Sequence, residues 1–390
     1  MDAQATREIL RFFDGIEDPR AANARHLLTD VLSIAILAVF CGAQGWAAVE
    51  TWGRGNHPWL KTFLLLPHGI PAHDTFDRVF GLLDPLAFEK AFNAFTASLT
   101  QGGQGLFLAV DGKTLRRSWK KAWSKTPVHL VSAFAAGNQL VLGQLACDAK
   151  SNEITAIPRL LALLELSGLT VTIDAMGCQR EIAAQIRAQQ GHYLLAVKDN
   201  QPTLHAKVKG LLDEAILENF AALKHGYHEQ AEPGDNHGRS EKRRVWVTDQ
   251  VHWLGEDLLR QWPGLSSLVV VETVRQDLGD LSGQVSCQRR YFISSHGGCD
   301  ARRMAQGIRE HWGIENRLHW QLDVSMNEDQ CRLRMRHGAE NFSRLRRIVI
   351  NKLKRWEIRK ENGKVMKVGL AIKQQACGWS RQFLLQALLA

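Results

Sequence analysis

Residues 169–174, LTVTID, decide the fold that this 390-residue sequence predicts. The first five residues carry no charge, which is typical of a central strand buried on both faces of a sheet. A second run of this kind, residues 106–110, is also followed by an aspartate, Asp111, as residues 169–173 are followed by Asp174. Two strands that each end in a carboxylate indicate an α/β sheet with a polar site along one edge.

The segments around these two strands alternate between strand-like and helix-like patterns. Further strands are predicted at 129–136, 139–146 and 192–197, and helices at 153–166 and 179–189. This order predicts an α/β fold in which a mixed sheet, with its first strands antiparallel, is flanked by helices. Residues 101–105, QGGQG, are typical of a linker before the sheet.

Residues 1–100 predict an all-helical N-terminal domain. Residues 31–49 carry Ser and Gln, and only roughly twelve of them are strongly apolar, so we expect a buried core helix and no membrane span. A polar turn before a helix that carries Thr75 and Arg78 resembles a DNA-reading helix-turn-helix. Plain packing between helices explains the same pattern equally well.

The later part of the chain predicts a β-rich insertion at about 200–295, then a helix, then a basic helical region at 339–390. The helix covers residues 307–329, GIREHWGIENRLHWQLDVSMNED. His311, Glu315 and His319 recur there at every fourth position, which places them on one helical face.

Charge and cysteine content narrow the class of protein. The formal net charge is +9, and residues 330–367 alone hold thirteen Lys or Arg against three Glu. This concentration of positive charge indicates a polyanionic partner. Seven scattered cysteines without a CxxC pair argue against a disulfide scaffold or a structural zinc site. The first residues lack the pattern of a signal peptide, so we expect a cytoplasmic protein.

Asp111, Asp174 and Glu315 are the candidate catalytic residues. The first two end predicted neighbouring strands, and Glu315 lies on a helix that can pack across the same edge. Crowded carboxylates need a cation, and oxygen ligands select Mg²⁺ or Mn²⁺. Two such ions about 4 Å apart suit in-line phosphoryl transfer.

Several motifs in a fixed order carry a resemblance to a known family. They are FFDGIEDPR near the start, VDGKTLR at 110–116, KSNEI at 150–154, TIDAMGCQ at 172–179, AVKDNQ at 196–201, HGRSEKRR at 237–244, RYFISS at 290–295 and HWGIENRLHWQLDVSMNED at 311–329. The sequence resembles the ISAs1-type, H-repeat-associated transposases, which belong to the IS4-like group of DDE transposases.

The resemblance implies an RNase H-like catalytic domain over residues 101–338, interrupted by the β-rich insertion. It implies metal-dependent DNA cleavage at insertion-sequence ends, followed by strand transfer into target DNA. Asp111, Asp174 and Glu315 then form the DDE triad and hold Mg²⁺ or Mn²⁺, with two ions in each active site. The implied partner is double-stranded DNA in the bacterial nucleoid, and synapsis of two ends favours a dimer.

Three positions depart from the wider IS4 signature. Its Tyr, Arg and Lys correspond to Ile308, His311 and Leu322 here. We therefore expect His311, Arg317 and His319 to replace the lost phosphate contacts.

Other basic residues are further candidates for DNA binding. Lys113 and Arg116 follow Asp111, where they can contact a backbone phosphate or serve as solvated charges of a turn. In the basic C-terminal segment, the predicted contacts to duplex phosphates are Arg346, Arg347, Lys352 and Lys354.

Two other functions remain open at the level of sequence. A DNA-binding regulator or a catalytically inactive transposase relic would keep the basic face. A metallohydrolase of small substrates would use His311, Glu315 and His319 around a transition metal, although the absence of an HExxH motif argues against it.

Overall fold

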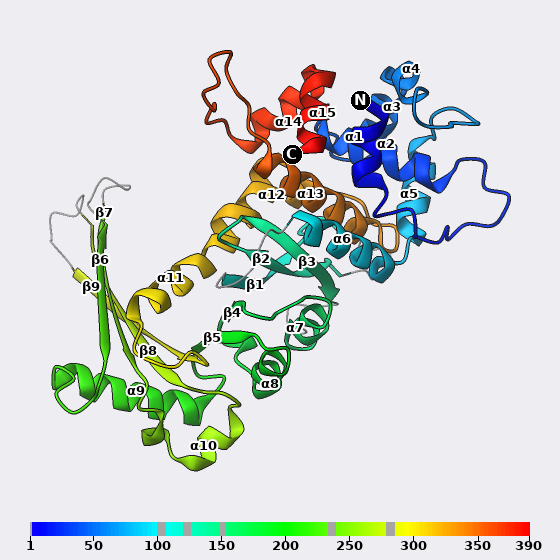
Figure 1. Cartoon of the computed structure of the whole chain (residues 1–390). Coiled ribbons are helices and arrows are strands. Elements are labelled where there is room, and N and C mark those ends of the chain that lie inside the picture. Colours follow the sequence, from blue (N-terminus) through cyan, green and yellow to red (C-terminus); the bar gives the residue numbers. More distant parts are fainter. Residues whose placement is uncertain (1, 100–106, 120–125, 148–152, 233–238, 278–284) are drawn as a thin grey trace. The chain divides into compact units, whose positions relative to one another are not determined.

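The computed structural model describes residues 2–99, 107–119, 126–147, 153–232, 239–277 and 285–390 (Figure 1). The predicted linker at 101–105, and residues 150–152 and 237–238 of the quoted motifs, lie outside the described residues. The chain forms two compact units. Unit 1 comprises Met1–Gly102, Gly112–Leu164 and Glu315–Ala390, and unit 2 comprises Gly103–Asp111 and Glu165–Ile314.

Unit 1 is mainly helical. Its helices are α1 (Asp2–Leu10), α2 (Leu28–Phe40), α3 (Trp46–Gly55), α4 (His57–Leu60), α5 (His73–Leu82), α6 (Pro85–Leu99), α7 (Glu153–Leu161), α12 (Trp320–Val324), α13 (Gly338–Arg355), α14 (Leu370–Trp379) and α15 (Arg381–Leu389). The N-terminal helices expected from the sequence are present, and they share a unit with the C-terminal helices.

Helix α13 forms the centre of unit 1. Its residues 338–353 are all buried, and it packs against α2, α5 and α6. Helix α2 is buried along nearly its whole length, so the uncharged segment of the sequence is a core helix, as predicted. Within the described ranges, no helix is both long enough and apolar enough to cross a membrane.

A β-hairpin completes unit 1. Strand β2 (His129–Ala135) pairs antiparallel with β3 (Leu140–Cys147), as the sequence predicts. Strand β1 (Phe107–Thr114) continues from unit 2 into unit 1, because its last three residues belong to unit 1.

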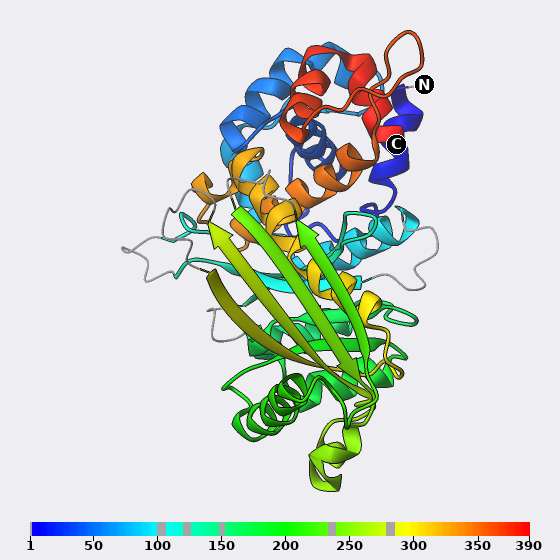
Figure 2. The same cartoon turned by 90° about the vertical axis from the view of Figure 1, so that its left-hand side faces the viewer.

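Unit 2 is built on a mixed sheet, which confirms the predicted α/β class with a mixed sheet flanked by helices. Its other strands are β4 (Thr170–Ile173), β5 (His192–Val197), β6 (Gly226–Glu232), β7 (Arg239–Thr248), β8 (Ser267–Asp277) and β9 (Val285–Ser294). β1, β4 and β5 are parallel, whereas β5, β9, β8, β7 and β6 pair antiparallel in that order. Figure 2 shows the long strands β7, β8 and β9 side by side.

Four helices accompany the sheet of unit 2: α8 (Arg180–Ala188), α9 (Pro202–Leu217), α10 (Glu256–Gln261) and α11 (Ala301–His311). Met304 and Ile308 of α11 pack on an apolar cluster that includes Val245 and Phe292 from the sheet. At Gly307 the helix approaches the sheet so closely that a Cβ atom would overlap the ring of Phe107.

The single long helix predicted over residues 307–329 is interrupted. α11 ends at His311, and a π-helical turn (Glu315–His319) precedes the short helix α12. A π-helical turn adds a residue to the repeat and shifts the helical phase. His311, Glu315 and His319 therefore do not share the continuous helical face that their spacing predicts.

Candidate active site

Two of the three predicted catalytic residues lie in unit 2, where the parallel pairing of β1 and β4 ends. β1 and β4 are parallel, and Val110 pairs with Ile173 as the last pair of their register. Asp174 directly follows β4, whereas β1 continues past Asp111 to Thr114, so the predicted end of the first strand at Asp111 is wrong. Both aspartates nevertheless follow the same residue pair directly. Asp174 is exposed, and its Oδ1 accepts a hydrogen bond from the backbone N–H of Met176 at 3.1 Å. This bond fixes the turn that presents the carboxylate.

The loop after β5 supports the turn after Asp174. The side-chain amide of Asn200 donates to the backbone oxygen of Ala175 at 2.5 Å, and that of Gln201 donates to the backbone oxygen of Cys178 at 3.0 Å. Our sequence interpretation gave neither residue a role. Their position within AVKDNQ, directly after a buried strand, is the signal that could have identified them.

His311 lies beside Asp174 at the end of α11. Its Nδ1 is 3.1 Å from the hydroxyl oxygen of Thr172, which is on the same face of β4 as Asp174 because strand side chains alternate. Burial lowers the pKa of His311, and the negative charge of Asp174 opposes this shift only in part. The imidazole is therefore neutral at pH 7 and held beside the carboxylate.

Glu315, the third predicted catalytic residue, is the first residue of the π-helical turn and belongs to unit 1. Its side chain is exposed, as is that of Arg317 in the same turn. Lys354 of α13 donates from Nζ to the backbone oxygen of Arg317 at 2.8 Å. This contact assigns the ammonium of Lys354 to holding the turn, which differs from the predicted role in binding duplex phosphates.

Lys113 is a structural cation of unit 1. Only 8% of its surface is exposed, and its Nζ donates to Asp323 at 2.6 Å and to Asp329 at 3.0 Å. The predicted contact between Lys113 and DNA phosphate is therefore wrong, because two carboxylates already neutralise the buried ammonium. Arg116 forms one ion pair with Asp329 at 3.1 Å, but its side chain is 80% exposed and remains available to DNA.

A buried hydrogen-bonded chain lies directly after Asp111 along β1. His129 Nε2 is 2.6 Å from Glu153 Oε1, and His129 Nδ1 is 2.8 Å from the hydroxyl oxygen of Thr114. A Cβ atom at Gly112 would overlap both the Glu153 carboxylate and the His129 ring. Gly112 is thus required next to a catalytic candidate, a role that our sequence interpretation missed although the motif VDGK contains this glycine.

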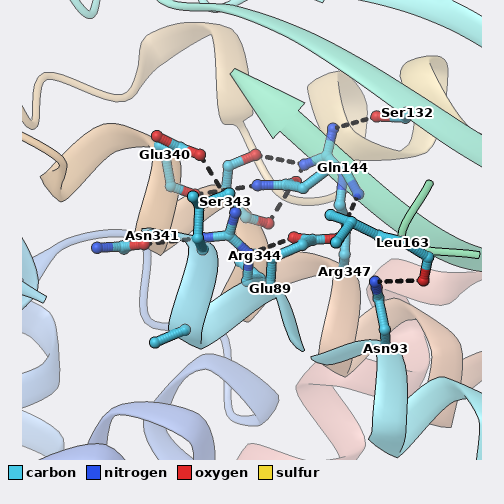
Figure 3. A network of polar contacts seen from close by, with 12 residues as sticks. Glu89, Asn93, Ser132, Gln144, Leu163, Glu340, Asn341, Ser343, Arg344 and Arg347 are labelled. Atoms are coloured by element: carbon cyan, nitrogen blue, oxygen red, sulfur yellow. Dashed lines mark hydrogen bonds and ion pairs between the residues drawn. The ribbon is translucent and has the colours of Figure 1, made fainter. Parts of the chain in front are cut away.

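Three arginines of α13, Arg344, Arg346 and Arg347, are buried within unit 1. Figure 3 shows Arg344 between Glu89 and Glu340, and Arg347 near Ser132 and Ser343.

The predicted contacts of Arg346 and Arg347 with duplex phosphates are therefore wrong. Arg346 is 1% exposed and Arg347 is 0% exposed. Arg347 donates to Glu328 at 3.1 Å, and the centre of the Arg346 guanidinium lies 4.5 Å from the ring centroid of Phe342. Hydrophobic periodicity could not reveal these arginines as core residues, because buried carboxylates distant in sequence compensate their charges.

Two further DNA-binding predictions fall on residues of unit 1 that are buried or half-buried. Lys352 is 6% exposed and donates to the backbone oxygen of Ala390 at 3.2 Å. Burial lowers the pKa of His319 to about 3, with further lowering from the charges of Arg347 and Lys113. The half-buried His319 is therefore neutral at pH 7, so it does not offer the positive charge that a phosphate contact needs.

The donor set at the strand ends suits a hard cation. Asp111 and Asp174 offer carboxylate oxygens, so Mg²⁺ or Mn²⁺ fits better than a soft metal. In the part of the chain that the structure describes, no group of three or more His, Cys, Asp and Glu side chains is placed to hold a metal.

Comparison with known families agrees with this geometry. A family model described as "Transposase DDE domain" matches residues 102–352, and a model described as "DDE_Tnp_1-associated" matches residues 10–96. The chain belongs to the DDE transposase family. The resemblance derived from the sequence motifs is thereby confirmed.

The relatives of this transposase-family chain carry corresponding names. It is 39% identical to the H repeat-associated putative transposase YhhI of Escherichia coli K12, over 94% of this chain and 93% of that protein. It is also 39% identical to the putative transposase YncI of Escherichia coli O157:H7, over 89% of this chain and 87% of that protein.

A solved structure with similarity to this transposase-family chain is the piggyBac transposase synaptic complex with hairpin DNA. The match covers 99% of this chain and 80% of the piggyBac chain, at 12% identity and a TM-score of 0.39. A TM-score of this size is too low to support an inference about fold or activity.

Proposed function

We propose that the protein is an active DDE transposase that cleaves DNA at insertion-sequence ends and joins them to target DNA. The observation that carries this proposal is that Asp111 and Asp174 directly follow the last residue pair of the parallel strands β1 and β4, in a chain of the DDE transposase family. Glu315, which begins the π-helical turn, completes the proposed triad. π-Helical turns occur frequently at functional sites, which supports this assignment.

Asp111, Asp174 and Glu315 are the residues that would hold Mg²⁺ or Mn²⁺, as two ions in each active site. When bound, such ions polarise the scissile phosphate and lower the pKa of the attacking hydroxyl. The protein contributes fixed orientation. The Met176 N–H holds one oxygen of Asp174, and the neutral imidazole of His311 adds no positive charge that would compete with a cation.

Double-stranded DNA is the proposed partner, both as transposon ends and as target. Among the predicted contacts, the exposed side chains of Arg116 and Arg317 remain the strongest candidates for backbone phosphates, and His311 remains at the site beside Asp174. Two ends must be held together for joining, so we propose a dimer on DNA, acting at the nucleoid in the bacterial cytoplasm.

The strand complement supports an RNase H-like core, and we include this fold in the proposal. An antiparallel hairpin, β2–β3, follows the first strand β1 along the chain, and β1, β4 and β5 are parallel. Residues 199–295, with α9 and β6–β9, then form the proposed insertion ahead of α11.

The test is cleavage and binding measured on the same labelled duplex that carries the element's own end. Asp111→Asn, Asp174→Asn and Glu315→Gln should each abolish cleavage in Mg²⁺ or Mn²⁺, because each removes one charged ligand while preserving size. Binding of the end should be unchanged or slightly stronger, since each change reduces repulsion of phosphate. Glu218→Gln, a change at the exposed residue directly after α9 and next to no proposed ligand, serves as the matched control.

The outcomes separate the alternatives. Binding by wild type without cleavage in any divalent ion would support a regulator or an inactive relic. Cleavage by Glu315→Gln at the wild-type rate would remove Glu315 from the triad. Tightly bound zinc in the purified protein, together with hydrolysis of small substrates, would support the metallohydrolase.

A further inference from the structure

A cavity between α11 and the long strands of unit 2 is rich in arginine. It is lined by His228, Arg243 and Arg290 from the sheet and by Arg309 and Trp312 at the end of α11. The described residues that line it include no Asp or Glu.

The cationic side chains stand on the face of the sheet that α11 covers. Arg290 lies opposite Val271, which lies opposite Val245, which lies opposite His228. Val245 and Val271 belong to the apolar cluster under α11. Side chains directly across a sheet share one face, so Arg290 and His228 flank the two valines of the apolar cluster on the face that α11 covers.

Arg290 is the side chain that needs a ligand. Its Nε is buried and, among the described residues, has no hydrogen-bond partner. Its guanidinium lies 5.4 Å from the ring centroid of Trp312. Burial lowers the pKa of Arg290, the positive charges of Arg243 and Arg275 lower it further, and the negative charge of Glu241 opposes this shift only in part.

The nearby carboxylates are committed to other arginines. Glu241 pairs with Arg243 and, at 2.6 Å, with Arg275, and Glu272 pairs at 3.2 Å with Arg244 and at 3.0 Å with Arg289. A half-buried guanidinium with an unpaired donor, whose nearby carboxylate is bound to other arginines, is costly. Such an arginine is stable when an anion enters the cavity, and a guanidinium fork matches two oxygens of a phosphate.

We propose that this cavity is a phosphate-binding site in which Arg290 holds one backbone phosphate of duplex DNA, with Arg243 and Arg309 adding positive charge. The proposal rests on the proposed function as a DNA-processing enzyme. It adds a DNA contact inside the β-rich insertion, which our sequence interpretation did not assign to any substrate.

The test measures binding of a labelled duplex of random sequence as a function of salt, without any requirement for cleavage. The logarithm of affinity falls with the logarithm of salt by about 0.9 per neutralised phosphate. Arg290→Met should reduce this slope by about 0.9 and weaken binding roughly tenfold. Arg290→Lys keeps the charge but loses the fork, so it should keep the slope and lose part of the affinity. Arg260→Met, at an exposed arginine of α10, is the matched control and should change neither quantity.

A second measurement distinguishes a ligand site from a structural arginine. Arg290→Met should raise the melting temperature of the free protein, because it removes an uncompensated charge, whereas loss of a structural contact would lower it. An unchanged salt slope in Arg290→Met would overturn the proposal. A rise in the melting temperature of wild type with inorganic phosphate, without any effect of the Arg290 change on duplex binding, would also overturn it. The ligand would then be a free phosphate. Cleavage of the element's end by Arg290→Met, with the reduced salt slope, would support both proposals. If wild type never cleaves the end but Arg290→Met still shows the reduced salt slope, the phosphate site would stand and the proposed enzymatic function would be overturned.

Discussion

Replacing Glu89 by Gln tests whether buried charge holds the helices of unit 1 together. Arg344 donates from Nε to Glu89 at 2.6 Å, and the backbone N–H of Gln144 on β3 donates to the other oxygen of Glu89, also at 2.6 Å. Both charged side chains are 0% exposed. Glutamine keeps the size of the side chain but removes its charge, and it turns an amide NH₂ toward one of the two donors.

The expected cost follows from these contacts. Removing one partner of a buried ion pair costs about 3–5 kcal/mol. The carboxylate of Glu340 accepts from Arg344 at 3.2 Å and still compensates part of the charge, so we expect the lower end, about 3 kcal/mol. In a unit of this size, each kcal/mol lowers the melting temperature by about 2–4 °C, so the fall should be roughly 6–12 °C.

The assay combines thermal unfolding by circular dichroism with amide hydrogen exchange in α13, which reports on unit 1 alone. The double variant Glu89→Gln/Arg344→Met should be about 2 kcal/mol more stable than the sum of its single changes predicts, because no unpaired charge remains. Asp257→Asn, which removes an exposed ion pair on α10, should have almost no effect. The reasoning would be refuted if Glu89→Gln had the melting temperature of wild type. It would also be refuted if the stability loss of the double variant equalled the sum of the losses of the two single variants.

Three further changes test the surroundings of the proposed triad. Lys354→Met should flatten the rise in the free energy of unfolding from about pH 7 to about pH 10, measured in urea. Burial lowers the pKa of Lys354 to about 7, and the charge of Arg317 lowers it further. Below that pH the protonated lysine reduces the free energy of unfolding by its full amount. This reduction is lost as the pH rises toward the pKa of lysine in the unfolded chain. Gly112→Ala should lower both the melting temperature and DNA cleavage, because its methyl group collides with Glu153; wild-type cleavage would contradict the close approach. Lys113→Met should cost about 1–2 kcal/mol in chemical denaturation, since it leaves the partly exposed Asp323 without its cation, and Arg116→Met in the same assay should be nearly neutral.

Local pattern was sufficient for much of the fold. The uncharged run before Asp174 forms strand β4 as predicted, and Asp111 and Asp174 directly follow the last residue pair of β1 and β4. The strands predicted at 129–136 and 139–146 also form, as an antiparallel hairpin. These predictions succeed because strand burial and turn chemistry are properties of a few consecutive residues.

The basic residues show where local pattern fails. Lys113, Arg346 and Arg347 have the composition of a DNA-binding surface, yet the structure buries all three. Their positive charge is compatible with the interior because Asp323, Asp329 and Glu328 lie beside them. A count of charges along the chain cannot distinguish an arginine that faces a phosphate from one that faces a buried glutamate.

The sequence by itself determined the family, the mixed α/β sheet and the two aspartates that follow the paired stretch of its first parallel strands, because ordered motifs and short-range hydrophobic pattern carry that information. Tertiary structure alone decided which cations are buried in unit 1, the π-helical turn that begins at Glu315, and the arginine-lined cavity around Arg290. The physical reason is that the cost of burying a charge depends on partners distant along the chain. Only the folded packing shows whether such a partner is present, as it is for Arg344, or whether a buried donor stays unpaired among the described residues, as Nε of Arg290 does.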